Sequence, residues 1–261
     1  MLRRIQAVIR RHVYDAARNP DRLSDMLFWP FLDVVTWGFF SRFLVRGGHS
    51  TFVAPAQLVG GIILWGAFRA FQRDVAVGFL AEIWTRNITG LFASPLTFPE
   101  YVAGLMVVNL GKLCLALGLI TLACHVVTGA PDLSLVLPLL APLAILVIFG
   151  AAIGLFVTAL ILRFSTRVQT LAYGLAGLLM PLSCVFYPIT ALPGPLRTIS
   201  GILPTTQAFE GMRELIRRQT LPASLLLQGL AGALLAAVVA CVFFGNTVRA
   251  VRRSGRLIRL D

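Results

Sequence analysis

Charged residues, and acidic ones above all, are scarce in this chain of 261 residues. Asp and Glu number 11 against 23 Lys and Arg, whereas 57% of the residues are hydrophobic. Three runs, 133–162, 168–196 and 219–248, contain no Asp, Glu, Lys or Arg at all. One soluble domain could not bury so much apolar surface in a single core. The composition therefore excludes an ordinary water-soluble enzyme and predicts a protein of the lipid bilayer.

Motifs of catalysis and metal binding are also lacking. The 4 cysteines and 3 histidines form neither a C-x-x-C nor an H-E-x-x-H pattern. The nearest approach to a phosphate-binding loop, Gly111-Lys112-Leu113, has leucine where the magnesium-binding hydroxyl belongs. The sequence thus predicts a chain that is not an enzyme. We expect no catalytic residues, no metal or cofactor bound by the chain, and no ATP hydrolysis by the chain alone.

The uncharged runs are long enough to cross the bilayer as helices, because about 20 residues span its hydrocarbon core. Together with weaker apolar segments before them, they predict an all-α polytopic membrane protein, with six transmembrane helices in a single domain over 1–261. The predicted spans are 26–45, 55–78, 101–128, 134–162, 168–188 and 221–246.

Basic residues indicate how these spans are oriented. On the predicted topology, 16 of the 23 Lys and Arg lie on one side, 6 lie on the other, and Lys112 lies inside a span. An excess of basic residues in short connections marks the cytoplasmic side, so we expect both termini, including a tail over 247–261, in the cytoplasm. These arginines are spread along helix ends rather than gathered on one soluble face. The basic composition therefore does not indicate nucleic-acid binding.

The first 25 residues predict an amphipathic helix on the membrane surface. Apolar residues recur on one side at three- and four-residue spacing, and arginines cover the other side, where anionic lipid headgroups would meet them. The apolar side comprises Leu2, Ile5, Ile9, Val13 and Ala16. The alternative is an exposed basic tail.

Residues 80–95, within FLAEIWTRNITGLFASPLTFPEY, predict a short cytoplasmic helix that prolines close. Glu82 and Arg86 are four residues apart and can pair along this helix. The apolar residues of this helix form a ridge, which comprises Ile83, Trp84, Ile88, Leu91 and Phe92. The alternative is an amphipathic segment that lies on lipid.

Residues 181–215, PLSCVFYPITALPGPLRTISGILPTTQAFEGMREL, run from an apolar segment through closely spaced prolines into a charged helix. The prolines are too close together for a second complete crossing of the membrane. The charges follow at helical spacing, and we expect Glu210 to pair with Arg213, and Glu214 with Arg218. An outer gate and an ordinary interfacial helix are both open interpretations.

These two segments, E-x-W-x-R…L-x-x-S-P-L over 82–96 and the proline-rich region over 181–215, resemble the corresponding regions of ABC-2 type permeases. The resemblance extends over nearly the whole chain. It implies a single ABC-2 type transmembrane domain, with a coupling helix over 80–95 that seats in a groove of a separate ATPase subunit. It also implies that 189–218 re-enters the membrane as short helices on the outer side, which the closely spaced prolines fit. The implied coupling residues are Glu82, Trp84, Arg86, Leu91 and Phe92, and the implied outer-gate candidates are Glu210, Arg213, Glu214 and Arg217.

The resemblance also implies partners and direction of transport. We expect an exporter of the cytoplasmic (inner) membrane in which a second copy of the chain completes the pathway. Two copies of the ATPase would bind ATP and Mg²⁺, lipids would surround the spans, and the cargo would be a lipid, a drug or a glycan. The alternatives are a secondary transporter or channel not coupled to ATP, and a membrane scaffold without transport activity.

Three polar residues fall inside predicted spans: Asp33, Asn109 and Lys112. A lysine isolated in lipid costs about 2.5 kcal/mol or more, so Lys112 should face a partner, a cavity or the protein interior. Asp33 is the candidate partner. Either the pair is structural, or these residues contact cargo or set the register of a dimer. Small residues at Gly104, Gly111 and Gly118, and over 150–154, predict close helix packing instead of chemistry.

Overall fold

The computed structural model describes helices joined by turns. The described residues are 2–18, 28, 32, 35–36, 39–40, 43, 55–85, 87, 90, 94–128, 133–218, 220 and 222–253. The α-helices are α1 (Leu2–Arg18), α3 (Pro55–Trp84), α5 (Phe98–Thr128), α6 (Leu133–Phe164), α7 (Thr170–Leu182), α8 (Gly194–Ile202), α9 (Pro204–Arg218) and α10 (Ala223–Arg253). Two 3-10 turns, Ser165–Val168 and Ile189–Ala191, flank α7 and precede α8.

Three of these helices contain stretches that are long and apolar enough to cross a membrane, by length and composition: Phe98–Gly118, Leu139–Phe164 and Ala223–Val251. The chain is thus a helical membrane protein with several crossings. The number of six spans stays a prediction. The first predicted span, 26–45, lies largely outside the described residues, and Asp33 is one of the residues not described.

Several predicted boundaries are corrected by the structure. Residues 80–84 are the last turn of α3, so no separate helix begins at residue 80. The predicted tail at 247 begins as the last turns of α10, which continues to Arg253. The predicted fifth span, 168–188, ends as an α-helix at Leu182. With 13 residues, α7 is about 20 Å long and does not by itself cross the hydrocarbon core.

Helix α6 lies at the centre of the bundle and packs against α3, α7, α9 and α10. Glycines allow the closest approach: a Cβ atom at Gly150 would lie 2.7 Å from the Phe68 carbonyl oxygen of α3, and one at Gly154 the same distance from that of Gln72. The small face predicted over 150–154 is therefore confirmed as the contact with α3. On α5, by contrast, added Cβ atoms at Gly111 and Gly118 would meet nothing within 4 Å.

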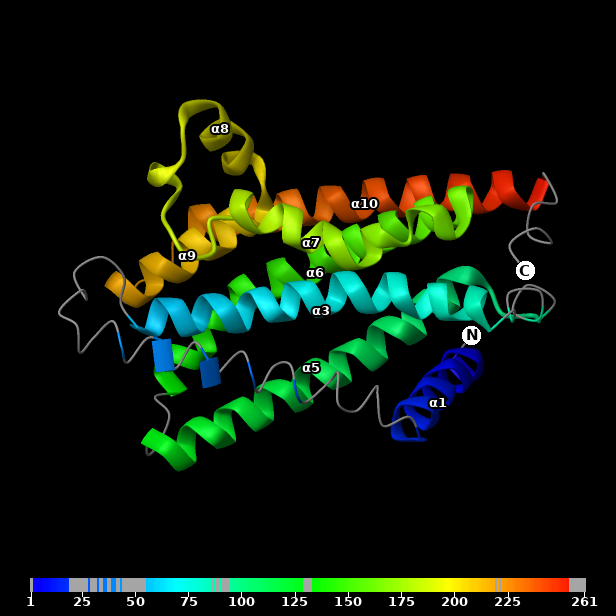
Figure 1. Ribbon diagram of the computed structural model, residues 1–261, viewed down its shortest axis with the longest axis horizontal. Coiled ribbons are helices and arrows are strands. Elements are labelled where there is room, and N and C mark those ends of the chain that lie inside the picture. The colour runs from blue at the N-terminus through cyan, green and yellow to red at the C-terminus, as the bar shows by residue number, and fades with distance from the viewer. Residues whose placement is uncertain are drawn as a thin grey trace.

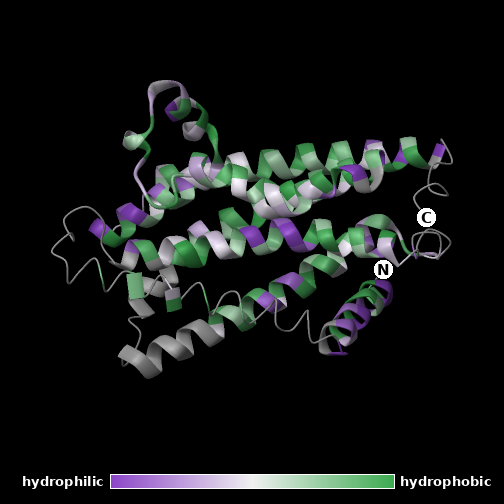
Figure 2. Cartoon of the chain, in the orientation of Figure 1, coloured by the Kyte–Doolittle hydropathy of each residue, from purple (hydrophilic) through white to green (hydrophobic). Residues whose placement is uncertain are grey.

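The bundle has two distinct ends (Figure 1). Helix α1 and the last residues of α10 lie at one end, and α8 and α9 lie at the other. Helix α3 extends along the bundle between them, and its 30 residues correspond to about 45 Å. Hydrophobic residues cover most of the long helices, with hydrophilic residues in the middle of α3 (Figure 2).

Candidate functional site

A buried carboxylate joins three segments at the α1 end of the bundle. Glu82, in the last turn of α3, is only 2% exposed. Its Oε2 accepts hydrogen bonds at 2.8 Å from Arg11 of α1 and from the side chain of Asn87. The Tyr101 hydroxyl of α5 lies 3.3 Å from Oε1. A buried carboxylate needs such partners, so this site fixes α1, α5 and the segment after α3 relative to α3.

The first turn of α5 is held by a capping interaction that continues to α1. Thr97 precedes the helix, and both its backbone N–H and its hydroxyl donate to Glu100 Oε2 at 2.8 Å. These bonds form the glutamate half of a T-x-x-E capping box, in which the glutamate side chain returns to the backbone N–H of the residue before the helix. Arg4 of α1 lies 3.6 Å from the same carboxylate oxygen and donates to the Pro95 carbonyl at 2.7 Å. Two arginines of α1 therefore hold the α3–α5 connection.

Close backbone contact brings α1 against α5. Val8 is the buried residue of α1, at 6% exposed, and it lies over Gly104 of α5. A Cβ atom at Gly104 would come within 2.6 Å of Val8 Cγ1, so only glycine fits without movement. The apolar side predicted for α1 is divided, because Leu2 and Val13 stay exposed while Ile5 and Ile9 are partly covered.

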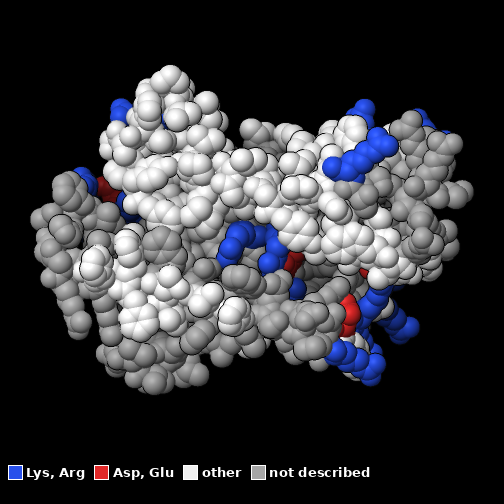
Figure 3. Space-filling view, in the orientation of Figure 1, with Lys and Arg blue, Asp and Glu red and all other residues white. Residues whose placement is uncertain are grey.

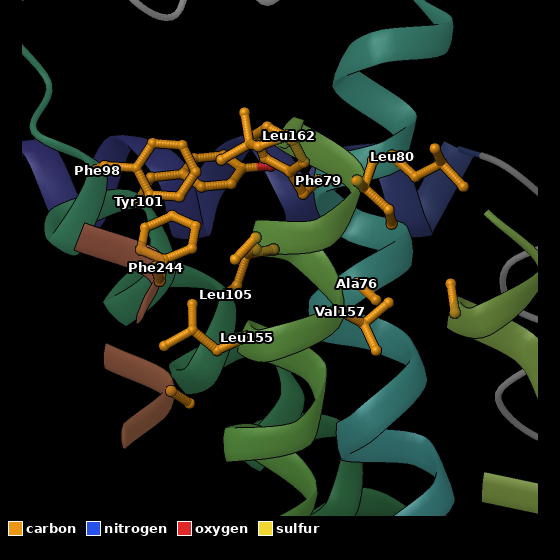
Figure 4. Close-up of a cluster of buried hydrophobic side chains, with 14 of the residues drawn as sticks. Ala76, Phe79, Leu80, Phe98, Tyr101, Leu105, Leu155, Val157, Leu162 and Phe244 are labelled. Carbon is orange, nitrogen blue, oxygen red and sulfur yellow. The ribbon is translucent and has the colours of Figure 1, made fainter. Parts of the chain in front are cut away.

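Aromatic side chains from α3, α5 and α10 pack together around Phe98 (Figure 4). The Phe98 ring lies 5.4 Å from Phe79, 5.9 Å from Tyr101 and 4.5 Å from Phe244, between ring centroids. Such ring pairs add about 0.5–1.5 kcal/mol beyond the buried area. We call Arg4, Arg11, Glu82, Asn87, Glu100 and Tyr101, with the three phenylalanines, the junction. The aromatic packing makes it a rigid connection between α1, α3, α5 and α10.

Two of the five predicted coupling residues are described. Trp84 is 52% exposed at the end of α3 and is available to a partner. Glu82 is buried and bound by Arg11, so it does not form part of an exposed face. Arg86, Leu91 and Phe92 lie outside the described residues, and the Glu82–Arg86 pair stays a prediction.

At the opposite end, the predicted pairs in α9 are confirmed. Arg213 binds Glu210 at 3.0 Å, and Arg218 binds Glu214 at 3.1 Å. The first pair does more than link two residues of one helix. Arg213 donates to the Cys184 carbonyl at 2.8 Å, and Glu210 accepts from the Ile189 N–H at 2.7 Å. These two charges hold the chain that follows α7.

Hydroxyl groups complete this contact between α7 and α9. Ser183 and Thr205 are fully buried, and their hydroxyl oxygens lie 2.8 Å apart. Thr206 donates to the Leu182 carbonyl at 3.1 Å, which satisfies an acceptor at the end of α7. We call Ser183, Cys184, Thr205, Thr206, Glu210 and Arg213 the outer lock, after the side of the membrane that the sequence predicts for them. Of the other gate candidates, Arg217 is exposed and Glu214 pairs on the helix surface, so neither belongs to the lock.

Lys112 has an intramembrane partner, but the sequence suggested a different one. Its Nζ lies 3.0 Å from Asp74 Oδ2, and Arg73 Nε lies 3.3 Å from Asp74 Oδ1. Asp33, the expected partner, is not among the described residues. The predicted count of cytoplasmic basic residues includes Arg69, Arg73 and Arg86, around the connection after the second span. Arg69 and Arg73 instead lie well inside α3, at least 11 residues before its end at Trp84. Without these two, 14 of the 23 Lys and Arg are still counted on the predicted cytoplasmic side, and the orientation stays a prediction.

Asn109 is 4% exposed and lies one turn before Lys112. Within the described part of the chain, its side-chain Nδ2 has no hydrogen-bond partner. Figure 3 shows basic and acidic side chains together in the middle of the molecule, over α3 and α5, whereas the other charged side chains described on this face lie toward its two ends. Charges are thus retained at a depth where the flanking residues are apolar.

Several residues of these sites were missed from the sequence: Arg11, Asn87, Tyr101 and Asp74. One signal was available for the junction, because Thr97-Phe98-Pro99-Glu100 is a capping-box pattern at the start of an apolar run. A single acid beside two arginines within an apolar stretch, at Asp74, was a second signal.

The model of the ABC-2 type transporter family matches residues 3–216, which is most of the chain and extends from α1 through α9. No curated protein matches the sequence. The fold agrees with this match. It is a helical membrane architecture, with a basic N-terminal helix attached to the α3–α5 connection and a broken helical region before α10. The chain therefore belongs to the ABC-2 type transporter family of membrane transport proteins.

Proposed function

We propose that the chain is the permease subunit of an ATP-driven exporter in the cytoplasmic (inner) membrane, with both termini in the cytoplasm. Two copies of the chain would form the pathway, and two copies of a separate ATPase would bind ATP and Mg²⁺. The cargo would be a lipid, a drug or a glycan that leaves the cytoplasm. Family membership supports the role of the chain as a permease, and the following contacts support its coupling to a motor.

The observation that carries the proposal is the burial of Glu82 in the junction. Trp84 is exposed two residues later, and the α3–α5 connection then begins. A motor that moves this connection would also move α3, because the Glu82–Asn87 hydrogen bond and the packed aromatic rings join them. Arg4 and Arg11 would transmit the same movement to α1.

Helix α3 supplies a path to the other end of the molecule. Near its start, a Cβ atom at Gly60 would lie 3.3 Å from the Met212 sulfur of α9, and one at Gly61 would lie 3.1 Å from the Val185 carbonyl. A shift of α3 would therefore act on α9 and on the chain beside Cys184. We infer that the outer lock opens when α3 moves as a rigid body.

Binding and transport by the complex with its ATPase test this proposal. Trp84→Ala should weaken ATPase co-purification, since loss of an aromatic anchor at an interface commonly costs about 2 kcal/mol or more. Arg11→Gln should leave the ATPase bound but reduce cargo export per ATP hydrolysed, because the buried carboxylate loses its tie to α1. Both are measured in reconstituted membranes, by pull-down, ATP hydrolysis and cargo efflux.

Tyr14→Ala is the matched control, because Tyr14 is an exposed aromatic residue of α1 outside the junction, at 64% exposed. It should behave as the unmodified protein in all three assays. Normal co-purification of Trp84→Ala, together with cargo flux that needs no ATP, would contradict the proposal and favour a channel or secondary transporter.

A further inference from the structure

The charged residues in the middle of α3 and α5 lie far from the ends of both helices. Asp74 is ten residues before the end of α3, and Lys112 is fourteen residues after the start of α5. These offsets correspond to about 15 Å and 21 Å along the helices, and Lys112 falls within Phe98–Gly118, a stretch long and apolar enough to cross a membrane. Ionised residues at this depth in transport proteins commonly mark a pathway or a ligand site.

The polar side chains around Asp74 and Lys112 carry more hydrogen-bond donors than acceptors. Lys112 carries three N–H groups, and among the described residues it has one hydrogen-bond partner, Asp74. Its side chain is 34% exposed, so the ammonium group is not sealed into the packing. Asn109 lies on the same face of α5, three residues earlier, and presents a buried amide nitrogen without a partner among the described residues.

An anion fits this arrangement and a cation does not. Arg73 and Lys112 both approach the Asp74 carboxylate, and their positive charges would repel a metal ion or an amine. Unused N–H donors on an ammonium and an amide, by contrast, match the oxygen atoms of a phosphate group. A phosphate also has more oxygens than these donors require, so it could satisfy Asn109 and Lys112 together.

We propose that Asn109 and Lys112, with Arg73 and Asp74 as flanking residues, form an intramembrane site for a phosphate-bearing ligand. Asp74 would hold Lys112 in place when the site is empty and would be displaced from it when the anion binds. The inference deepens the proposed function, since it names a chemical group of the cargo or of a bound lipid. It can be tested without ATP or the ATPase, so a failure of coupling would not affect the result.

The experiment is a thermal-unfolding titration of the purified full-length chain in detergent micelles. The probes are phosphatidylglycerol, diacylglycerol of the same acyl chains, which lacks phosphate, and inorganic phosphate. Phosphatidylglycerol should raise the unfolding midpoint with saturation, and the phosphate-free lipid should raise it much less. Lys112→Gln should need about ten-fold more phosphatidylglycerol for half-saturation, because it loses a charge-assisted hydrogen bond. Asp74→Asn should bind more tightly than the unmodified protein, because a competing carboxylate is removed.

Asn109→Leu separates binding from folding. Leucine has the same number of side-chain heavy atoms, and it removes a buried donor that has no partner in the described structure. Its unfolding midpoint without lipid should not fall, yet its half-saturation should rise several-fold. Arg163→Gln, which removes an exposed cation at the end of α6, is the control and should bind as the unmodified protein does.

Two results would overturn the proposal: equal responses to the two lipids, or unchanged half-saturation in both Lys112→Gln and Asn109→Leu. The inorganic phosphate titration identifies the source of the group. Protection by phosphate alone indicates that the site binds the free ion, and protection by phosphatidylglycerol alone indicates that it binds the headgroup of an amphiphile. Either of these results supports a phosphate-bearing ligand.

Discussion

Cys184 occupies an unusual backbone conformation at the place where α7 ends. Its φ is +53°, in the left-handed region that non-glycine residues adopt at a cost of about 1–2 kcal/mol. The neighbouring contacts compensate for this, because Arg213 binds the Cys184 carbonyl and is itself held by Glu210. A single guanidinium thus stabilises both a strained turn and the contact between two helices.

The reactivity of the Cys184 thiol can report how often the outer lock opens. Cys184 is 0% exposed, so in a chain where Cys114, Cys124 and Cys241 are replaced by serine it should react slowly with a maleimide. Arg213→Gln removes a charged hydrogen bond worth about 1.5 kcal/mol or more, which corresponds to about a ten-fold rise in labelling rate if local opening limits the reaction. The rate is measured by mass spectrometry of the labelled chain.

Arg218→Gln provides the comparison for this rate. Arg218 also pairs with a glutamate of α9, but it is 62% exposed, and such surface pairs contribute about 0–1 kcal/mol. Its labelling rate should stay near that of the unmodified chain. Equal acceleration by both substitutions would show that general loosening of α9, and not the Arg213 contact, controls access to Cys184.

At the scale of elements, glycine determines which helices approach closely. A Cβ atom at Gly154 of α6 would lie 2.7 Å from the Gln72 carbonyl oxygen and 2.8 Å from Val75 Cβ, both on α3. Neither atom is the end of a flexible side chain, so α3 and α6 would have to separate. In a membrane, where helices gain little from leaving lipid, such packing contributes much of the association.

Identical substitutions on two helices should therefore have opposite effects. Gly154→Ala should lower the free energy of unfolding by about 1–3 kcal/mol, as overpacking does. Gly174→Ala on α7 meets nothing within 4 Å and should be neutral or stabilising by up to about 1 kcal/mol. Unfolding in detergent measures both. The same loss of stability in the two variants would contradict the close α3–α6 contact.

The sequence predicted where the helices lie along the chain more accurately than it predicted where each helix ends. The predicted spans 101–128 and 134–162 match α5 and α6 within a few residues, since continuous apolar stretches of this length favour spanning helices. Hydropathy marks where a segment leaves lipid, whereas a helix ends where its hydrogen bonds stop. Helices α3 and α10 therefore continue into polar sequence, and α7 ends within an apolar run.

The same distinction applies to the candidate sites. Glu210 with Arg213, and Glu214 with Arg218, were predicted because helix geometry alone brings residues three and four apart together. Glu82 and Arg11 are 71 residues apart, and Lys112 and Asp74 are 38 apart. Such pairs depend on how helices pack, which one sequence does not specify by spacing. The sequence therefore indicated Glu82 and Lys112 as site residues but did not indicate their partners, Arg11 and Asp74.

At the scale of the whole molecule, the two ends of the bundle differ in chemistry. The junction end carries the arginines of α1 and, on α10, Arg249 and Arg253, whereas the outer lock lies at the other end beside α8 (Figure 1). Because basic residues mark the cytoplasmic side of short connections, this difference predicts which end faces the cytoplasm. It also predicts that the proposed contact with the motor and the outer lock lie on opposite sides of the membrane.

Labelling of single cysteines tests this orientation with residues that the structure describes. Thr190 and Arg253 are both exposed, the first beside α8 and the second at the end of α10. In a background without other cysteines, a membrane-impermeant maleimide added to intact cells should modify Thr190→Cys. It should modify Arg253→Cys only after the membrane is permeabilised. Modification of both from the same side would contradict the orientation, and would place the junction and the outer lock on one side, where a motor could not drive alternate opening across the membrane.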